Sequence, residues 1–99
     1  MRLSNRLKGF ILHASRQSFG DAEVYLFGSR MKETQKGGDI DLAIKTDMGK
    51  NEFRAGKIKF KACLVRLDLD IGMDVVRFAP DMDYVLRSEI LSSSFKLSE

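Results

Sequence analysis

The residues of this chain that could do chemistry are a glycine–serine pair and two aspartates that follow it. Gly28 and Ser29 close an apolar segment, nine residues intervene, and Asp39 and Asp41 then flank Ile40. A glycine at a strand end lets backbone amides approach an anion closely, and a serine adds a hydroxyl donor, so the pair suits a polyphosphate. Carboxylates at positions i and i+2 of one strand point to the same face, with Cα atoms about 6–7 Å apart.

Two carboxylates that converge on one site favour a bound cation. Like charges 4 Å apart repel by about 4 kcal/mol under an effective dielectric constant of 20. A hard divalent ion such as Mg²⁺ relieves this repulsion and prefers oxygen ligands. Two such ions about 3.5–4 Å apart can stabilise both the attacking and the leaving oxygen of a phosphoryl transfer. The pattern therefore predicts a site for metal-assisted phosphoryl transfer.

A third carboxylate is needed to complete such a site, and Asp74 is the main candidate. It lies within an apolar, strand-like segment, where a charged side chain has no packing role. A neighbouring strand could place it beside Asp39 and Asp41. Asp70 is the alternative, because it has the same strand parity, but it lies in the approach to the strand.

Hydrophobic spacing predicts the helices that would position these residues. Apolar residues three and four apart predict helices over 3–18 and 51–67, and Gly20 is placed to end the first. Either Asp81 or Asp83 can cap a last helix that runs to about residue 91.

Three further segments read as strands. They are β-branched, aromatic or alternating, with residues 30–38 as a loop between the first two, and they cover 24–27, 39–45 and 73–78. Residues 95–97 form either a last short strand or a docked tail. The element order predicts an α+β fold, a small mixed β-sheet with helices on one face.

Length and composition limit the classes of protein that fit. The 99 residues allow one compact domain, assigned to residues 1–99, without room for a separate substrate domain. The hydrophobic fraction of 43% and the charged fraction of 31% exclude a disordered or collagen-like chain. No apolar run approaches the ~20 residues of a membrane span, and a single cysteine cannot form an intrachain disulfide. We therefore expect a cytoplasmic protein without a membrane partner.

The segment LFGSRMKETQKGGDIDL resembles the signature of the polymerase-β-like nucleotidyltransferase superfamily. Four residues match that signature position by position: Gly28, Ser29, Asp39 and Asp41. Asp74 matches the less tightly spaced third acid. The short length and the Phe-Gly-Ser-Arg form resemble the minimal nucleotidyltransferases, which are antitoxin partners of HEPN-type toxins. The loop departs from the usual pattern at Met31, Glu33 and Gly38, so its nucleotide-facing shape is expected to differ.

The resemblance implies a polymerase-β palm-like fold and a Mg²⁺-dependent transfer of AMP from ATP to an acceptor hydroxyl. It implies that this hydroxyl belongs to a tyrosine of a cognate HEPN toxin, and that the modification would block the activity of the toxin. The carboxylates would hold two Mg²⁺ ions and serve as catalytic residues and metal ligands: Asp39, Asp41 and Asp74. Gly28 and Ser29 would bind the β- and γ-phosphates. Arg30 either joins them on the nucleotide or acceptor, or is a surface arginine.

Other functions remain open on the sequence alone. In one, the chain is a non-catalytic antitoxin that neutralises its partner by stoichiometric contact, as a homo- or hetero-oligomer. In another, a small-molecule nucleotidyltransferase shares the motif but normally needs a second domain. The 50–61 region carries five basic residues: Lys50, Arg54, Lys57, Lys59 and Lys61. They fit the solvated face of an amphipathic helix best, and a docking surface for an acidic partner next. A nucleic-acid site fits least, because no aromatic side chains are interleaved to stack on bases.

Overall fold

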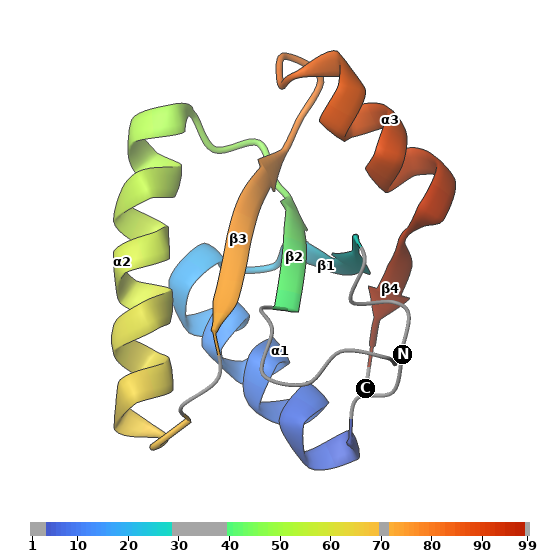
Figure 1. Cartoon of the computed structure of the whole chain (residues 1–99). Coiled ribbons are helices and arrows are strands. Elements are labelled where there is room, and N and C mark those ends of the chain that lie inside the picture. The colour runs from blue at the N-terminus through green and yellow to red at the C-terminus, as the bar shows by residue number, and fades with distance from the viewer. Residues whose placement is uncertain (1–3, 29–39, 70–71, 99) are drawn as a thin grey trace.

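The computed structural model describes residues 4–28, 40–69 and 72–98 of the chain. Helices and strands alternate irregularly along it (Figure 1), in the order α1 (Asn5–Phe19), β1 (Glu23–Phe27), β2 (Ile40–Lys45), α2 (Lys50–Arg66), β3 (Met73–Phe78), α3 (Tyr84–Ser93) and β4 (Phe95–Leu97). The predicted elements are all present, with ends that agree to within two residues. Residues 95–97 form a strand rather than a docked tail.

The strands form one mixed sheet in the order β3-β2-β1-β4. β1 pairs with β2 and with β4 in antiparallel fashion, whereas β2 and β3 are parallel. Parallel neighbours cannot be joined by a tight turn, so α2 carries the chain back from the end of β2 to the start of β3. The predicted α+β fold with a small mixed sheet is confirmed.

The two faces of the sheet are covered by different helices (Figure 1). α1 and α2 pack on one face, where Ile11, Phe60 and Leu42 belong to the same buried cluster. α3 packs on the opposite face, where Ile90 joins a second cluster with Phe27, Ala43 and Phe78. The prediction of helices on one face therefore holds for α1 and α2 but not for α3, because apolar side chains on the second face give α3 a surface to bury.

Local capping agrees with the sequence pattern. Gly20 ends α1 with a φ of +73°, and its N–H donates to the Arg16 carbonyl. Asp83, rather than Asp81, caps α3 and accepts a hydrogen bond from Leu86 N at 2.9 Å. None of the helices within the described ranges has the length and hydrophobicity that crossing a membrane requires.

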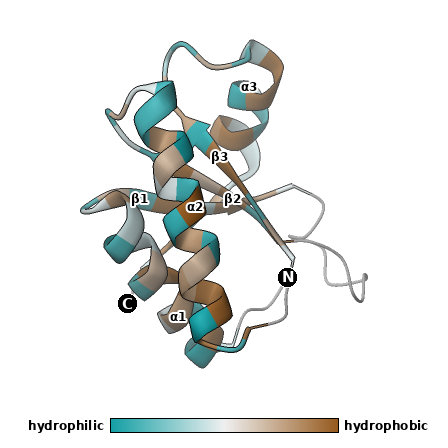
Figure 2. Cartoon of the chain, turned by 90° about the vertical axis from the view of Figure 1, so that its left-hand side faces the viewer, coloured by the Kyte–Doolittle hydropathy of each residue, from teal (hydrophilic) through white to brown (hydrophobic). Residues whose placement is uncertain are grey.

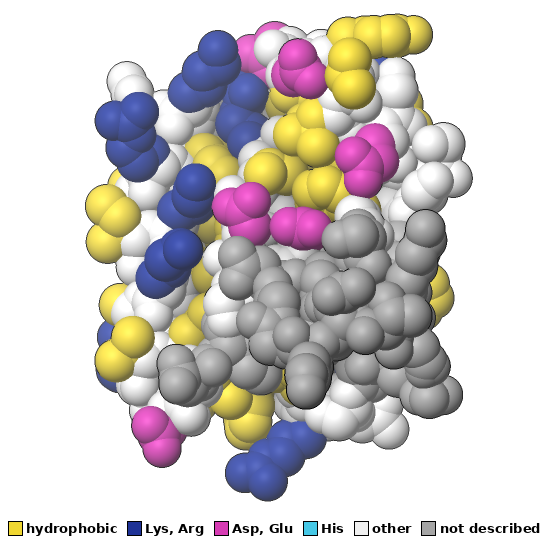
Figure 3. All heavy atoms as spheres, viewed as in Figure 1, with side chains coloured by type: hydrophobic (Ala, Val, Ile, Leu, Met, Phe, Trp, Pro, Cys, Tyr) yellow, Lys and Arg dark blue, Asp and Glu magenta, His cyan; other side chains and the backbone are white. Residues whose placement is uncertain are grey.

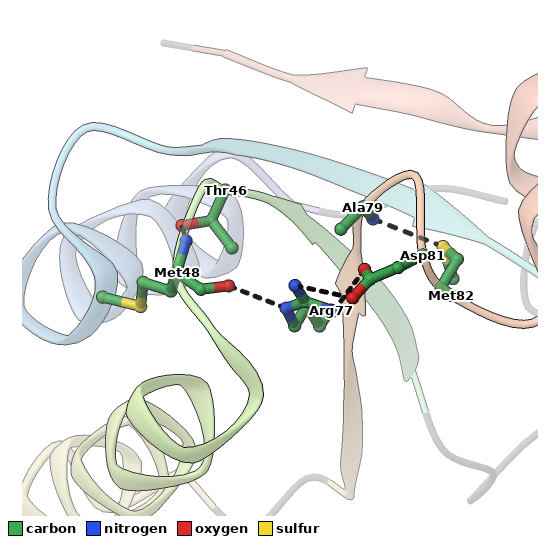
Figure 4. A network of polar contacts seen from close by, with 6 residues as sticks. All are labelled: Thr46, Met48, Arg77, Ala79, Asp81 and Met82. Atoms are coloured by element: carbon green, nitrogen blue, oxygen red, sulfur yellow. Dashed lines mark hydrogen bonds and ion pairs between the residues drawn. The ribbon is translucent and has the colours of Figure 1, made fainter.

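An arginine joins the two loops that follow the parallel strands (Figure 4). Arg77 Nε donates to the Met48 carbonyl at 2.8 Å, which ties β3 to the loop between β2 and α2. The same guanidinium donates to both carboxylate oxygens of Asp81, at 2.8 and 3.5 Å, in the turn before α3. Only 16% of the Arg77 side chain is exposed. This contact fixes the β2–β3 pair at the end opposite the first residues of β3.

We expect the Arg77–Asp81 pair to stabilise the fold at neutral pH and to stop doing so in acid. The hydrogen bond from Arg77 lowers the pKa of the Asp81 carboxyl below its usual range. A carboxyl whose pKa is lower in the folded than in the unfolded state adds stability above the unfolded pKa and loses it as the pH falls through the folded value. Urea unfolding should show Asp81→Asn less stable than wild type at neutral pH, and the difference should shrink as the pH falls below the usual range of carboxyl pKa values. A difference that does not change with pH would contradict this account.

Helices α1 and α2 approach closely at a glycine. A Cβ on Gly56 would lie 2.5 Å from Phe19 Cε1 and 3.1 Å from the Ser18 carbonyl oxygen. Phe19 has little freedom to move, because its ring stacks on Phe53 with centroids 4.9 Å apart and only 5% of the residue is exposed. Packing therefore requires glycine at position 56, although alanine has the higher helix propensity.

Gly56→Ala should destabilise the protein by about 1–3 kcal/mol, because overpacking outweighs the gain in helix propensity. Gly9→Ala is the matched control, since Gly9 is also helical but has no atom within 4 Å of an added Cβ. That substitution should stabilise by about 0.5–1 kcal/mol. Free energies of unfolding from denaturant titration test both; equal gains at the two positions would show that the helix contact is not tight.

Candidate functional site

Two aspartates meet where the parallel strands pair. Asp41 of β2 and Asp74 of β3 are direct partners in the parallel register. Adjacent strands lie about 4.8 Å apart, and paired residues share a face, so the two carboxylates are neighbours. The strand alternation buries Met73 and Val75, at 5% and 1% exposure, and turns Asp74 out on the other face. Asp74 is exposed and Asp41 is half-buried.

Gly28 lies directly against Asp41 of this pair. It follows Phe27, the residue of β1 that pairs with Asp41. Its φ of +82° is a left-handed conformation that favours glycine. A Cβ at this position would overlap Asp41 Oδ2 and lie 3.2 Å from Asp41 Cγ. Because Gly28 has no side chain, the Asp41 carboxylate can occupy this space.

The remaining predicted site residues lie outside the part of the chain that the structure describes. These are Ser29, Arg30 and Asp39, together with the alternative acid Asp70. Their assigned roles stay predictions. The structure does place the first β2 residues at the site, because Ile40 N–H donates to the Gly72 carbonyl at 2.9 Å just before β3 begins.

The donors present fit a hard divalent cation. Asp41 and Asp74 supply carboxylate oxygens from adjacent strands, and oxygen ligands are those that Mg²⁺ prefers. Within residues 4–28, 40–69 and 72–98, no group of three or more His, Cys, Asp and Glu side chains could hold a metal ion. The sequence pattern assigns the third carboxylate to Asp39, two positions before Asp41.

The face of the molecule seen in Figure 3 is asymmetric in charge. Acidic side chains lie between Lys and Arg side chains along α2 and apolar side chains toward α3. A separate pair of hydrogen-bonded titratable groups lies on β1. Tyr25 donates to Glu23 at 2.7 Å, which lowers the pKa of the Glu23 carboxyl and raises that of the Tyr25 hydroxyl. Glu23 is at the start of β1, four residues before Phe27. These two groups therefore lie beside the pairing of β1 with β4, away from the aspartate pair.

Gly28→Ala should weaken divalent-metal binding by at least about tenfold, because the new methyl group competes with the Asp41 carboxylate for space. The left-handed backbone adds a cost of about 1–2 kcal/mol in stability. Titration with Mn²⁺ as the probe, followed by calorimetry, measures the affinity, and circular dichroism checks the fold.

Gly49→Ala is the matched control, since Gly49 also lies next to the end of an element, at the start of α2, but has a φ of −71° and open space around an added Cβ. Its Mn²⁺ affinity should equal that of wild type. A folded Gly28→Ala protein with unchanged affinity would show that the glycine does not shape a metal site.

Comparison with known proteins identifies the fold. The family model described as "Polymerase beta, Nucleotidyltransferase" matches residues 20–99. Among curated proteins, none matches the chain significantly.

Three solved structures are similar across 92% of this chain. A toxin–antitoxin structure with AMP-PNP has a TM-score of 0.69 and 23% identity over 72% of its own chain. A MntA–HepT toxin–antitoxin mutant with two aspartates changed to glutamate has a TM-score of 0.69 and 18% identity over 71% of its chain. The MntA–HepT toxin–antitoxin has a TM-score of 0.64 and 22% identity over 68% of its chain. At these identities the likeness shows a shared fold. Since the family model covers most of the sequence, including Gly28, Asp41 and Asp74, the chain belongs to the polymerase-β nucleotidyltransferase family.

Proposed function

We propose that this nucleotidyltransferase transfers AMP from ATP to a tyrosine hydroxyl of a cognate HEPN toxin, in a Mg²⁺-dependent reaction, and so acts as an antitoxin. The observation that carries the proposal is the direct pairing of Asp41 with Asp74 against the side-chain-free Gly28. Family membership supports the reaction type. The toxin–antitoxin assemblies with the same fold, one of them with AMP-PNP, support the partner and the nucleotide.

The carboxylates of Asp41 and Asp74, with Asp39, are the groups that would hold Mg²⁺. When bound, two such ions would neutralise the triphosphate and stabilise the leaving pyrophosphate. Phosphoryl transfer leaves little covalent work for side chains, so positioning and electrostatics supply most of the rate increase.

The residues of the chain have separate tasks in this reaction. Gly28, with no side chain, lets the phosphates approach the backbone at the end of β1, and Ser29 and Arg30 are assigned to the same phosphates. Asp74, the more exposed carboxylate, accepts the proton of the acceptor hydroxyl. The hydroxyl oxygen bonds to the α-phosphorus of ATP, the bond from that phosphorus to the bridging oxygen breaks, and pyrophosphate leaves.

A cytoplasmic location belongs to this proposal, since the reaction needs ATP and an intracellular toxin as acceptor. The single cysteine agrees with it, because Cys63 is a free cysteine buried in the core.

Asp41→Asn and Asp74→Asn should each reduce AMP transfer by at least about 100-fold, since each removes a carboxylate that would hold Mg²⁺ beside the reacting phosphate. The purified protein is incubated with Mg²⁺, labelled ATP and the proposed cognate HEPN toxin, and added AMP is located by mass spectrometry. Glu89→Gln is the control, because Glu89 is an exposed acidic residue of α3 outside the site. It should transfer AMP at the wild-type rate.

Two results would contradict the proposal. One is neutralisation of the partner by the asparagine variants as complete as that by wild type, which would show inhibition by stoichiometric contact. The other is AMP found only on a small-molecule acceptor, which would keep the transferase chemistry and discard the antitoxin role.

A further inference from the structure

Four basic residues form a column along one side of α2. They are spaced by four, three and four positions, which places them on one side of a helix: Lys50, Arg54, Lys57 and Lys61. Lys57 is half-buried and the other three are exposed. We call these four residues the basic column. Its position is visible in Figure 3 as dark blue side chains along the α2 side of the molecule.

The basic column faces the edge of the sheet that carries the candidate site. Lys61 Nζ donates to the Met73 carbonyl at 3.4 Å, and the next residue of β3 is Asp74. β3 is an edge strand, with β2 as its neighbour in the sheet. A molecule bound along the column would therefore end beside the aspartate pair.

The charges of the column have no carboxylate partner on α2. Among the described residues, the ion pairs within 4.0 Å join Glu23 with Lys45 and with Lys96, and Arg77 with Asp81. Lys50 acts on the Asp81 carboxyl only at longer range, where it helps lower the pKa. Like charges three and four positions apart repel one another and disfavour the helix. An acidic partner would relieve this repulsion.

Exposed apolar side chains run beside the basic column. Ile58 and Val65 are 68% and 75% exposed and lie two helical turns apart. Each follows a column residue by four positions, Arg54 and Lys61 respectively, and so lies next to it on the helix surface. Figure 2 shows α2 toward the viewer, with hydrophobic and hydrophilic segments both present on its outward side.

We propose that this side of α2 binds an acidic amphipathic helix of a partner protein. The basic column would pair with its Asp and Glu side chains, while Ile58 and Val65 would pack on its apolar side. RNA matches the charge but not the apolar residues, and the aromatic residues of α2, Phe53 and Phe60, are buried and cannot stack on bases. The proposal concerns binding alone and does not depend on nucleotide transfer.

The test uses a synthetic amphipathic peptide of about 18 residues, five helical turns, with Leu on one side and Glu on the flanks. Its affinity for the full chain is measured by fluorescence anisotropy. Arg54→Glu/Lys57→Glu should weaken binding at least about tenfold, because it places repulsive charges in the column. Ile58→Ser should weaken it severalfold. Lys59→Glu/Arg66→Glu changes the net charge equally on another side of α2 and should leave the affinity within about twofold.

Four outcomes would overturn the proposal. They are equal weakening by both double variants, equal binding of a scrambled peptide of the same composition, absence of measurable peptide binding, and column-dependent binding of a single-stranded RNA tighter than that of the peptide. Circular dichroism and thermal unfolding of each variant separate loss of binding from loss of fold. AMP transfer is not the readout, so failure here leaves the proposed reaction standing and the reverse also holds.

Discussion

The parallel pairing of β2 with β3 is the constraint on which the candidate site depends. It places Asp41 opposite Asp74, although 32 residues (42 to 73) lie between them in the sequence. Two negative side chains in direct register oppose the pairing electrostatically. The hydrophobic core offsets this repulsion. Leu42 and Val75, the next pair in the register, are buried at 0% and 1% exposure on the α1–α2 face. The same strands thus carry a stabilising face and a functional face.

The elements around this pair explain why it can be held in place. Helix α2 connects β2 with β3 and, together with α1, covers one face of the sheet. Arg77 holds the far ends of these two strands through hydrogen bonds to Met48 and Asp81. α3 covers the other face only where Phe27, Ala43 and Phe78 offer it apolar contacts. Asp41 and Asp74 lie nearer the start of their strands, at the border of that cluster, where Phe27 pairs with Asp41. Burial by α3 thus stabilises the sheet and leaves the aspartate end open on the same face.

Two glycines show how local chemistry serves long-range geometry. Gly28 is needed because the Asp41 carboxylate from another strand occupies the place of a side chain, and Gly56 is needed because Phe19 from another helix does the same. The first concerns the site and the second the core. Neither requirement can be read from the residues next to the glycine, because the atoms that exclude a side chain are distant in sequence.

The sequence by itself determined the elements, because helix periodicity, strand alternation and capping residues act within a few positions, and it supplied the candidate site residues by their types and spacing. It indicated the Gly28–Asp41 spacing and selected Asp74 as the third acid. Only the tertiary structure decided the register that makes Asp41 and Asp74 neighbours, the opposite placement of α3, and the choice of Asp83 as cap while Asp81 pairs with Arg77. These depend on contacts between segments far apart along the chain, where the free energy of packing, and not local conformational preference, selects the arrangement.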